Sequence, residues 1–192
     1  MIRRLAPLAL IAALALPDAA SAADYTIDTK GAHAAIGFRI KHLGFSWLSG
    51  RFDQFSGTFS YDAKAPEASK VSVEIDTTSV NSNHAERDKH LSSPDFLDVA
   101  KFPKATFVSK SVTPSGDGKA KIVGDLTLRG VTKEVAIDAS YVGGGADPWG
   151  GNRAGFTGTT KLALADYGIN FNLGPASKEV ELTLDVEGVQ NK

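Results

Sequence analysis

Hydrophobic and polar residues alternate along most of the chain, and this alternation predicts β-strands. Within residues 35–41, Ile36, Phe38 and Ile40 fall on one face of a strand, while charged residues fall on the other. Such a pattern is typical of a half-buried antiparallel strand. Similar runs, separated by turns that contain glycine or proline, predict about eight long strands and a short first one. The predicted strands cover residues 24–28, 35–41, 55–61, 71–75, 105–109, 121–128, 132–141, 154–164 and 178–187.

Three of the connections between these strands have distinctive sequences. Residues 43–52 are rich in aromatic side chains but have no clean period, so we expect a structured connection there. Arg129 and Gly130 are expected to form a tight two-residue turn, because glycine tolerates the positive φ that such a turn requires. The glycine-rich residues 143–153 are expected to form a long loop.

One stretch near the middle of the chain has helical rather than strand-like features. Asn83 can cap a first helix, with Glu86 three residues later, and Ser93 can cap a second. These residue types are favoured at helix N-termini. The sequence therefore predicts a short helical insertion around residues 83–99. Because titratable side chains are concentrated in this insertion, we expect it to lie near whatever the protein binds.

The number of predicted strands and the short turns that join them favour an all-β fold. Periodicity alone does not separate a sandwich from a closed antiparallel barrel. Small residues inside the strands favour the barrel, because a closed sheet must bend, and no strand looks like a protected edge. These residues are Gly37, Gly57, Gly124 and Gly158. A barrel of about eight strands holds either packed side chains or one slender ligand.

The N-terminus has the features of a secretory signal peptide. Two arginines precede an apolar run over residues 5–16, which leads into small residues of the kind that signal peptidase recognises. The run is shorter than the roughly 20 apolar residues that a membrane span needs. We therefore expect residues 1–22 to be a signal peptide, cleaved near Ala22 or Ala23, and residues 23–192 to form a single domain.

Composition narrows the function further. Without residues 1–22 the chain keeps 170 of its 192 residues, with 19 basic and 21 acidic side chains and a net charge of about −2. This balance gives no electrostatic reason to bind nucleic acid. The chain has no cysteine, which excludes disulfides, thiolate catalysis and cysteine-ligated metal sites.

A metal site is the first chemical possibility that the helical insertion raises. His84 and Asp88 would share one face of a helix, and His90 follows two residues later. The two histidines are six residues apart, however, which is poor spacing for one face. The alternative is that the histidines cap and pack while Arg87 and Asp88 form local pairs, and we favour it. We therefore expect no metal and no other cofactor.

Catalytic motifs are missing from the sequence. It lacks a nucleophile elbow, a phosphate-binding glycine loop and a zinc-protease helix motif, so we do not expect an enzyme. Eight of the ten phenylalanines lie between Phe38 and Phe107. This distribution fits a pocket for a long apolar molecule, and it fits an ordinary packed core equally well.

Six separated motifs occur in order along the chain. They are Arg-Asp-Lys-His-Leu at 87–91, Ser-Pro-Asp-Phe at 93–96, Phe-Pro-Lys-Ala-Thr-Phe at 102–107, Leu-Thr-Leu-Arg-Gly-Val-Thr-Lys at 126–133, Asp-Pro-Trp-Gly at 147–150 and Asp-Tyr-Gly at 166–168. Together they resemble the YceI-like family of bacterial periplasmic proteins. The resemblance implies a lipocalin-like antiparallel barrel that carries a polyisoprenoid or related long-chain lipid in its interior. It transfers no catalytic residue.

The resemblance also suggests how residues divide between the cavity and its rim. Arg87, Asp88 and His90 belong to the first motif and are the candidates for the rim and for contact with a lipid headgroup. The candidate lining residues are apolar and come mostly from the predicted strands. They are Ile36, Phe38, Ile40, Phe59, Val73, Phe96 and Phe107.

The expected function is therefore that of a periplasmic carrier that sequesters a polyisoprenoid or a similar long-chain amphiphile. Two alternatives stay open: an enzyme that acts on an isoprenoid-type or small apolar substrate, and a stress-related structural protein with a filled core. A homodimer and transient contact with a membrane also stay open.

Overall fold

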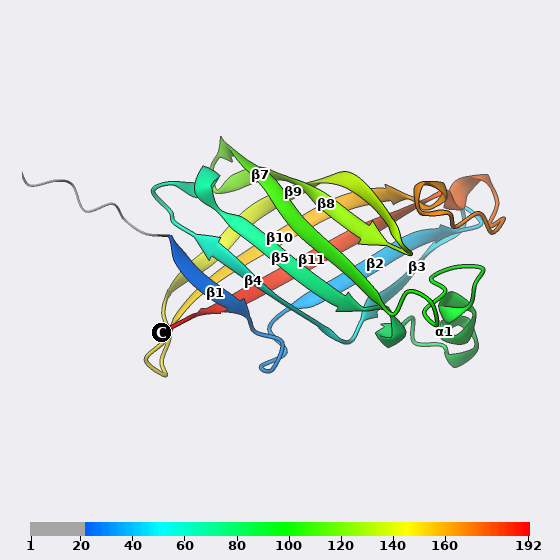
Figure 1. Ribbon diagram of the computed structural model, residues 1–192, viewed down its shortest axis with the longest axis horizontal. Helices are drawn as coiled ribbons and strands as arrows, with labels where there is room; N and C mark the ends of the chain where they lie inside the picture. Colours follow the sequence, from blue (N-terminus) through cyan, green and yellow to red (C-terminus); the bar gives the residue numbers. More distant parts are fainter. Residues whose placement is uncertain (1–21) are drawn as a thin grey trace, which may run out of the picture.

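The computed structural model describes residues 22–192, which form an antiparallel β-barrel with one short α-helix at one end (Figure 1). The predicted signal peptide lies outside the described residues except for Ala22. The strands are β1 (Ala23–Ile27), β2 (Ala35–His42), β3 (Ser46–Phe52), β4 (Phe55–Tyr61), β5 (Lys70–Asp76), β6 (Val80–Asn81), β7 (Lys104–Gly116), β8 (Lys119–Leu128), β9 (Val131–Ala146), β10 (Asn152–Ala163) and β11 (Glu179–Gln190). The helix is α1 (Ala85–Ser92), and the 3₁₀ turns are η1 (Pro66–Ala68), η2 (Thr77–Ser79), η3 (Leu164–Tyr167) and η4 (Pro175–Ser177).

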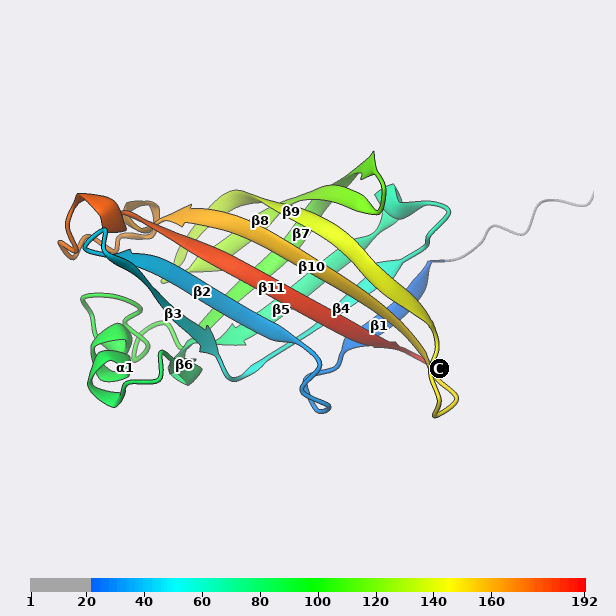
Figure 2. The same cartoon turned by 180° about the vertical axis from the view of Figure 1, so that it is seen from behind.

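Every paired set of neighbouring strands is antiparallel, and the sheet closes on itself. The order around the barrel is β1-β4-β5-β7-β8-β9-β10-β11, and β11 returns to pair with β1. β2, β3 and β6 continue the sheet from the other half of β11. Seen from behind, β9, β10, β11 and β2 lie side by side (Figure 2). The predicted antiparallel barrel is thus confirmed.

The eleven strands of residues 22–192 occupy eight positions around the barrel, because three positions hold a broken strand. β11 pairs with β2 over residues 180–185 and with β1 over residues 188–190, so β1 and β2 are two halves of one strand. In the same way β3 continues into β4, and β5 into β6. The breaks fall on neighbouring strands, at residues 28–34, 53–54 and 77–79.

Two predicted connections are corrected by the structure. Residues 43–52 contain strand β3. Its residues Leu48, Gly50 and Phe52 pair with the inward-facing residues of β2. The long loop predicted at 143–153 shortens, because β9 runs through the three glycines, which pair with β10. Because glycine has no side chain, these residues show no alternation of apolar and polar positions, and the sequence pattern did not indicate a strand there.

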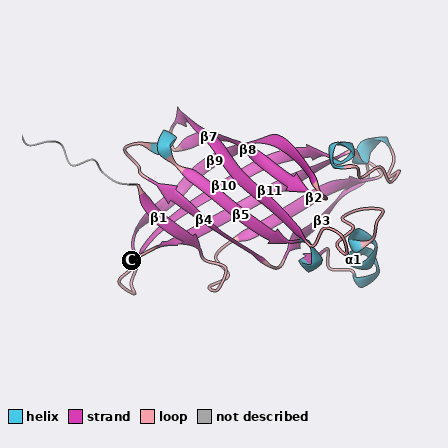
Figure 3. Ribbon diagram, in the orientation of Figure 1, coloured by secondary structure: helices cyan, strands magenta, loops and turns pink. Residues whose placement is uncertain are grey.

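The helical insertion contains one helix, not two. α1 is capped by His84, whose Nδ1 accepts a hydrogen bond from the Arg87 amide at 3.3 Å, and the predicted cap Asn83 instead has φ +61°. The second predicted helix, after Ser93, is a series of turns (Figure 3). Ser93 does accept a hydrogen bond from the Asp95 amide, but the chain does not continue into a helix.

The two-residue turn between β8 and β9 forms as predicted. Arg129 and Gly130 have φ of +52° and +74°, as a tight hairpin turn requires. The Arg129 guanidinium donates to the carbonyl oxygens of Pro94, at 2.6 Å, and of Gly168. It therefore ties the hairpin to both the helical insertion and η3, a role that the sequence did not suggest.

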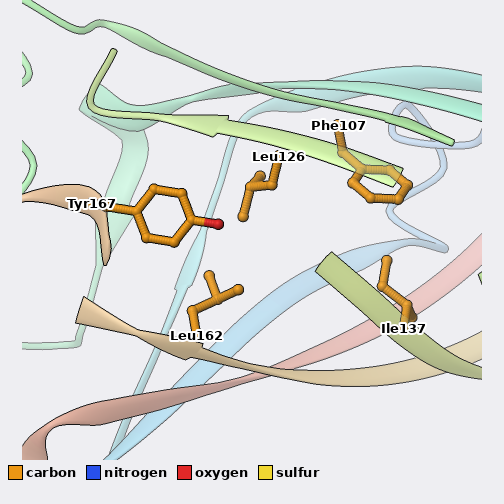
Figure 4. Close-up of a cluster of buried hydrophobic side chains, with 5 residues drawn as sticks. All are labelled: Phe107, Leu126, Ile137, Leu162 and Tyr167. Carbon is orange, nitrogen blue, oxygen red and sulfur yellow. The ribbon is translucent and has the colours of Figure 1, made fainter. Parts of the chain in front are cut away.

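Two clusters of buried side chains lie inside the barrel at different heights. Tyr25, Ile27, Phe59 and Ala154 pack near the end where the chain terminates. Toward the α1 end, Phe107, Leu126, Ile137, Leu162 and Tyr167 form the second cluster (Figure 4). The Tyr167 hydroxyl points between Leu126 and Leu162 into the barrel, and it has no hydrogen-bond partner among residues 22–192. Burial raises the pKa of Tyr167 to about 12, so the phenol is neutral.

A charged network joins the β1–β2 connection to the other side of the barrel. Arg153 on β10 donates to Asp28 at 2.7 Å, to Asp147 at 3.0 Å and to Glu187 on β11. His33 lies 3.0 Å from Asp28. Hydrogen bonds from His33 and Arg153 hold the pKa of Asp28 well below its ordinary value of 3.8.

We expect the Asp28 network to stabilise the barrel in a pH-dependent way. A carboxyl whose pKa falls on folding contributes stability above its unfolded pKa, and that contribution is lost as the pH falls through the folded pKa. Asp28→Asn should therefore lower the thermal midpoint at pH 7, and the gap to the wild type should narrow below pH 3.8. Circular dichroism melts from pH 7 to acid would measure this, with Asp24→Asn as the exposed control. A gap independent of pH would contradict the assignment.

Replacement of Tyr167 by phenylalanine tests the unpartnered hydroxyl. A buried hydroxyl without a partner costs about 1–3 kcal/mol, so Tyr167→Phe should leave the free energy of unfolding unchanged or raise it by about 1 kcal/mol. Leu162→Ala, in the same cluster, should lower it by about 2–5 kcal/mol. Urea denaturation measures both variants. Destabilisation by Tyr167→Phe would show that the hydroxyl has a partner in solution.

Candidate ligand-binding cavity

An apolar cavity of about 370 Å³ lies inside the barrel. Its lining includes members of both buried clusters, so it occupies the space between them. Aliphatic and aromatic side chains from β4, β5 and β7–β11 make up most of its wall. This volume is at the lower end of the range of about 300–1,000 Å³ for ligand pockets. The interior is thus not completely filled by the protein's own side chains.

Four of the predicted lining residues are on the cavity wall: Ile36, Phe59, Val73 and Phe107. The other three, Phe38, Ile40 and Phe96, are not among the residues that line it. Phe38 packs against Phe52, with ring centroids 5.9 Å apart, and lies over Gly50. Ile40 pairs with Leu48 and Val180, one step further from the cavity. Phe96 contacts His90 and Phe171 instead.

The cavity is open at the end away from α1. We call this opening the mouth, and define it by Tyr61, Pro66, Lys70, Gly116, Lys119 and Tyr141, which all line the cavity. Tyr61 and Tyr141 come from strands that are not neighbours, yet their rings stack with centroids 5.6 Å apart. Phe156 packs edge-on against both. These three rings close one side of the barrel end and leave the mouth beside η1 and the β7–β8 turn.

Sequence reasoning missed the mouth. Tyr61 ends a run of residues that alternate with period two, so the sequence did indicate that its side chain faces inward. Nothing in the sequence pairs Tyr61 with Tyr141, because this contact depends on how the closed sheet brings β4 and β9 together. Burial raises the pKa of Tyr61 above its ordinary value of 10.0.

Arg87, Asp88 and His90 lie at the opposite end and are not among the residues that line the cavity. Arg87 donates from Nε to the Ser82 hydroxyl and from Nη2 to the Ser82 carbonyl, both at 2.7 Å. Asp88 accepts from the Ser82 amide at 2.7 Å. His90 bonds to Asp95 at 3.0 Å. The polar atoms of this motif therefore hold the helical insertion together.

The geometry gives no support to a metal at the helical insertion, since His84 caps α1 and Asp88 bonds to Ser82. In the described part of the chain, one group of three such residues has ligand atoms close enough to share an ion: Asp28, His33 and Glu187. The Arg153 guanidinium contacts both of those carboxylates. It already supplies the positive charge that they need.

A larger hollow of about 700 Å³ lies where the ladder between β9 and β10 ends, after the pair Asp138 and Thr159. Its lining mixes both signs of charge. Arg39 and Lys161 both form ion pairs with Glu181, at 2.6 and 3.0 Å. A hollow lined by charged groups of both signs is a poor site for an apolar ligand.

Exposed apolar side chains gather at the β2–β3 turn, at the α1 end of the barrel. Leu43, Phe45 and Trp47 are 59%, 88% and 45% exposed. Arg39 and Lys41 lie over the Trp47 ring, at 4.3 and 5.6 Å from its centroid. Because the mouth is at the opposite end of the barrel, the β2–β3 turn lies far from it. Of the helices in residues 22–192, none has the length and hydrophobicity that crossing a membrane requires.

Comparison with known proteins agrees with this fold. A family model for the YceI-like domain matches residues 25–188. A UPF0312 protein of Shewanella sp. (strain ANA-3) is 63% identical over 177 residues, which are 92% of this chain and 93% of that protein. The crystal structure of the Campylobacter jejuni YCEI protein is 30% identical, with a TM-score of 0.73 over 80% of this chain and 91% of that one.

A second similar structure is described as a polyisoprenoid binding domain from Saccharophagus degradans. It is 16% identical, with a TM-score of 0.63, and the match covers 89% of this chain and 100% of that one. At this identity the similarity establishes the shared fold. The family match, which spans most of the chain, and the close relatives establish more: the chain belongs to the YceI-like family.

Proposed function

We propose that the protein is a carrier that holds one long-chain lipid with its hydrocarbon tail in the barrel cavity. The observation that carries this proposal is the apolar cavity of about 370 Å³ with an open mouth. A filled structural core would leave no such space. The shared fold of the Saccharophagus degradans polyisoprenoid binding domain supports the same class of ligand.

The binding energy would come from partition rather than from directional bonds. Each CH₂ group moved from water into an apolar site gains about 0.8 kcal/mol. Because a water molecule occupies about 30 Å³ of liquid, the cavity has room for roughly a dozen groups of that size. A tail of about twelve carbons would fill it, and a longer prenyl chain would extend through the mouth or widen the barrel.

A carrier role is favoured over catalysis by the polar groups near the cavity. Thr157 and Thr160 line it, and their hydroxyls donate to the backbone carbonyls of Leu184 and Ala136. The Tyr167 hydroxyl is buried among apolar side chains and has no hydrogen-bond partner among the described residues. An enzyme needs several such groups converging on the reacting atoms.

The periplasm is the location that this proposal assigns, on the basis of the signal-like residues 1–22. There the carrier would hold a water-insoluble molecule between membranes. Organic extracts of protein purified from its native periplasm, without detergent, would be examined by mass spectrometry. A lipid present at one molecule per protein would support the carrier and identify its cargo.

A chain-length series provides a direct test in vitro. Straight-chain alcohols of about six to sixteen carbons would displace a fluorescent apolar probe from delipidated protein. The dissociation constant should fall about fourfold with each added CH₂, and level off near twelve carbons, because the cavity is then full. No dependence on chain length would contradict tail burial.

Two alanine variants on β9 make the test specific to the cavity. Ala139 is buried and lines the cavity, whereas Ala136, three residues earlier, is exposed. Ala139→Phe should fill part of the space and weaken binding of the twelve-carbon alcohol by about tenfold or more. Ala136→Phe should leave binding unchanged. Equal effects of the two variants would move the site away from the interior.

A further inference from the structure

The mouth of the cavity has a charge asymmetry that the carrier proposal does not use. Of the residues that line the cavity, the charged ones are Lys70 and Lys119, and no aspartate or glutamate lines it. Lys70 begins β5 and Lys119 begins β8, so both lie at the mouth. An apolar cavity entered past two cations is electrostatically matched to a ligand with a negative head.

Neither lysine is neutralised by a carboxylate in the described residues. Two other lysines, on β7 and β8, are paired: Lys110 lies 2.6 Å from Asp125, and Lys121 lies 2.5 Å from Asp138. Lys70 and Lys119 take part in no ion pair within residues 22–192. Their ammonium groups are thus available to a bound molecule.

A hydroxyl group next to Lys70 also lacks a partner among the described residues. Ser69 lines the cavity next to Lys70, and its Oγ is buried without a hydrogen-bond partner among the described residues. A buried hydroxyl of this kind costs about 1–3 kcal/mol unless a ligand or water satisfies it. The turns that flank the mouth contain Asp62, Glu67 and Asp117, but these carboxylates are not part of the lining.

From this arrangement we propose that the ligand enters tail first and that Lys70 and Lys119, with the Ser69 hydroxyl, hold an anionic head at the mouth. The head is a carboxylate or a phosphate, since both accept hydrogen bonds from ammonium and hydroxyl groups. The ligand is therefore a single-chain amphiphile with a negative head. This inference rests on the proposed carrier function, because it assumes that the tail is buried.

Binding of matched amphiphiles tests the inference. Dodecanoate, dodecyl phosphate, dodecanol and dodecyltrimethylammonium share one tail and differ in the charge of the head. Each would be titrated into purified protein at low salt and at about 1 M NaCl, below its micelle concentration. The two anions should bind about tenfold more tightly than the alcohol. The advantage should shrink in high salt, which screens exposed charges.

Glutamine variants assign the effect to the mouth. The double variant Lys70→Gln/Lys119→Gln should bind dodecanoate no better than dodecanol, while dodecanol binding stays as in the wild type. Lys64→Gln is the matched control, because Lys64 is an exposed lysine of the same β4–β5 connection that does not line the cavity. It should keep the tenfold preference for anions.

The outcomes separate this inference from the carrier function. Equal binding of the anions and the alcohol to the wild type, or tighter binding of the ammonium compound, would overturn the anionic site and leave the carrier intact. Failure of all four compounds to bind would overturn the carrier itself. Inorganic phosphate should not displace dodecanoate at millimolar concentration. If it did, the lysines would form a site for free anions and not for lipid heads.

Discussion

Closure of the backbone ladder around β11 is the interaction on which the rest of the structure depends. β11 pairs with β10 along its whole length, and with β2 and β1 on its other side. Once the sheet is closed, every second residue of each strand faces the barrel interior. Closure is weakest where three strands are broken. There Arg153 joins the β1–β2 connection to β10 and β11 through Asp28 and Glu187, which compensates for the missing ladder.

Much of the fold could be predicted from the alternation of apolar and polar side chains. In a barrel with an apolar interior, the apolar residues of each strand face inward and the polar ones face outward. Prediction failed where the residues showed no such alternation. β3 has Gly50 on its inward face, and the end of β9 is three glycines, so only pairing with neighbouring strands makes them strands. The cap at Ser93 was a real local signal, but the chain turned toward the contacts of Phe96 and Arg129 instead.

The candidate site was predictable in part, for a related reason. Ile36, Phe59, Val73 and Phe107 were among the seven candidates for the lining, and all four line the cavity. The face of a strand on which a residue lies does not determine its position along the barrel axis. The sequence therefore could not distinguish Phe38 and Ile40 from the residues that line the cavity. Nor could the sequence reveal the mouth, since Lys70 and Lys119 resemble any lysines beside turns until the closed sheet brings their strands to one opening.

The exposed β2–β3 turn gives the molecule a direction. Phe45 and its apolar neighbours lie at the α1 end, whereas the cavity opens at the other. A surface or partner that contacted the turn would meet the α1 end of the barrel and leave the mouth exposed. On the carrier proposal, a contact made through the turn and exchange of the ligand would take place at opposite ends of one molecule, so neither would obstruct the other.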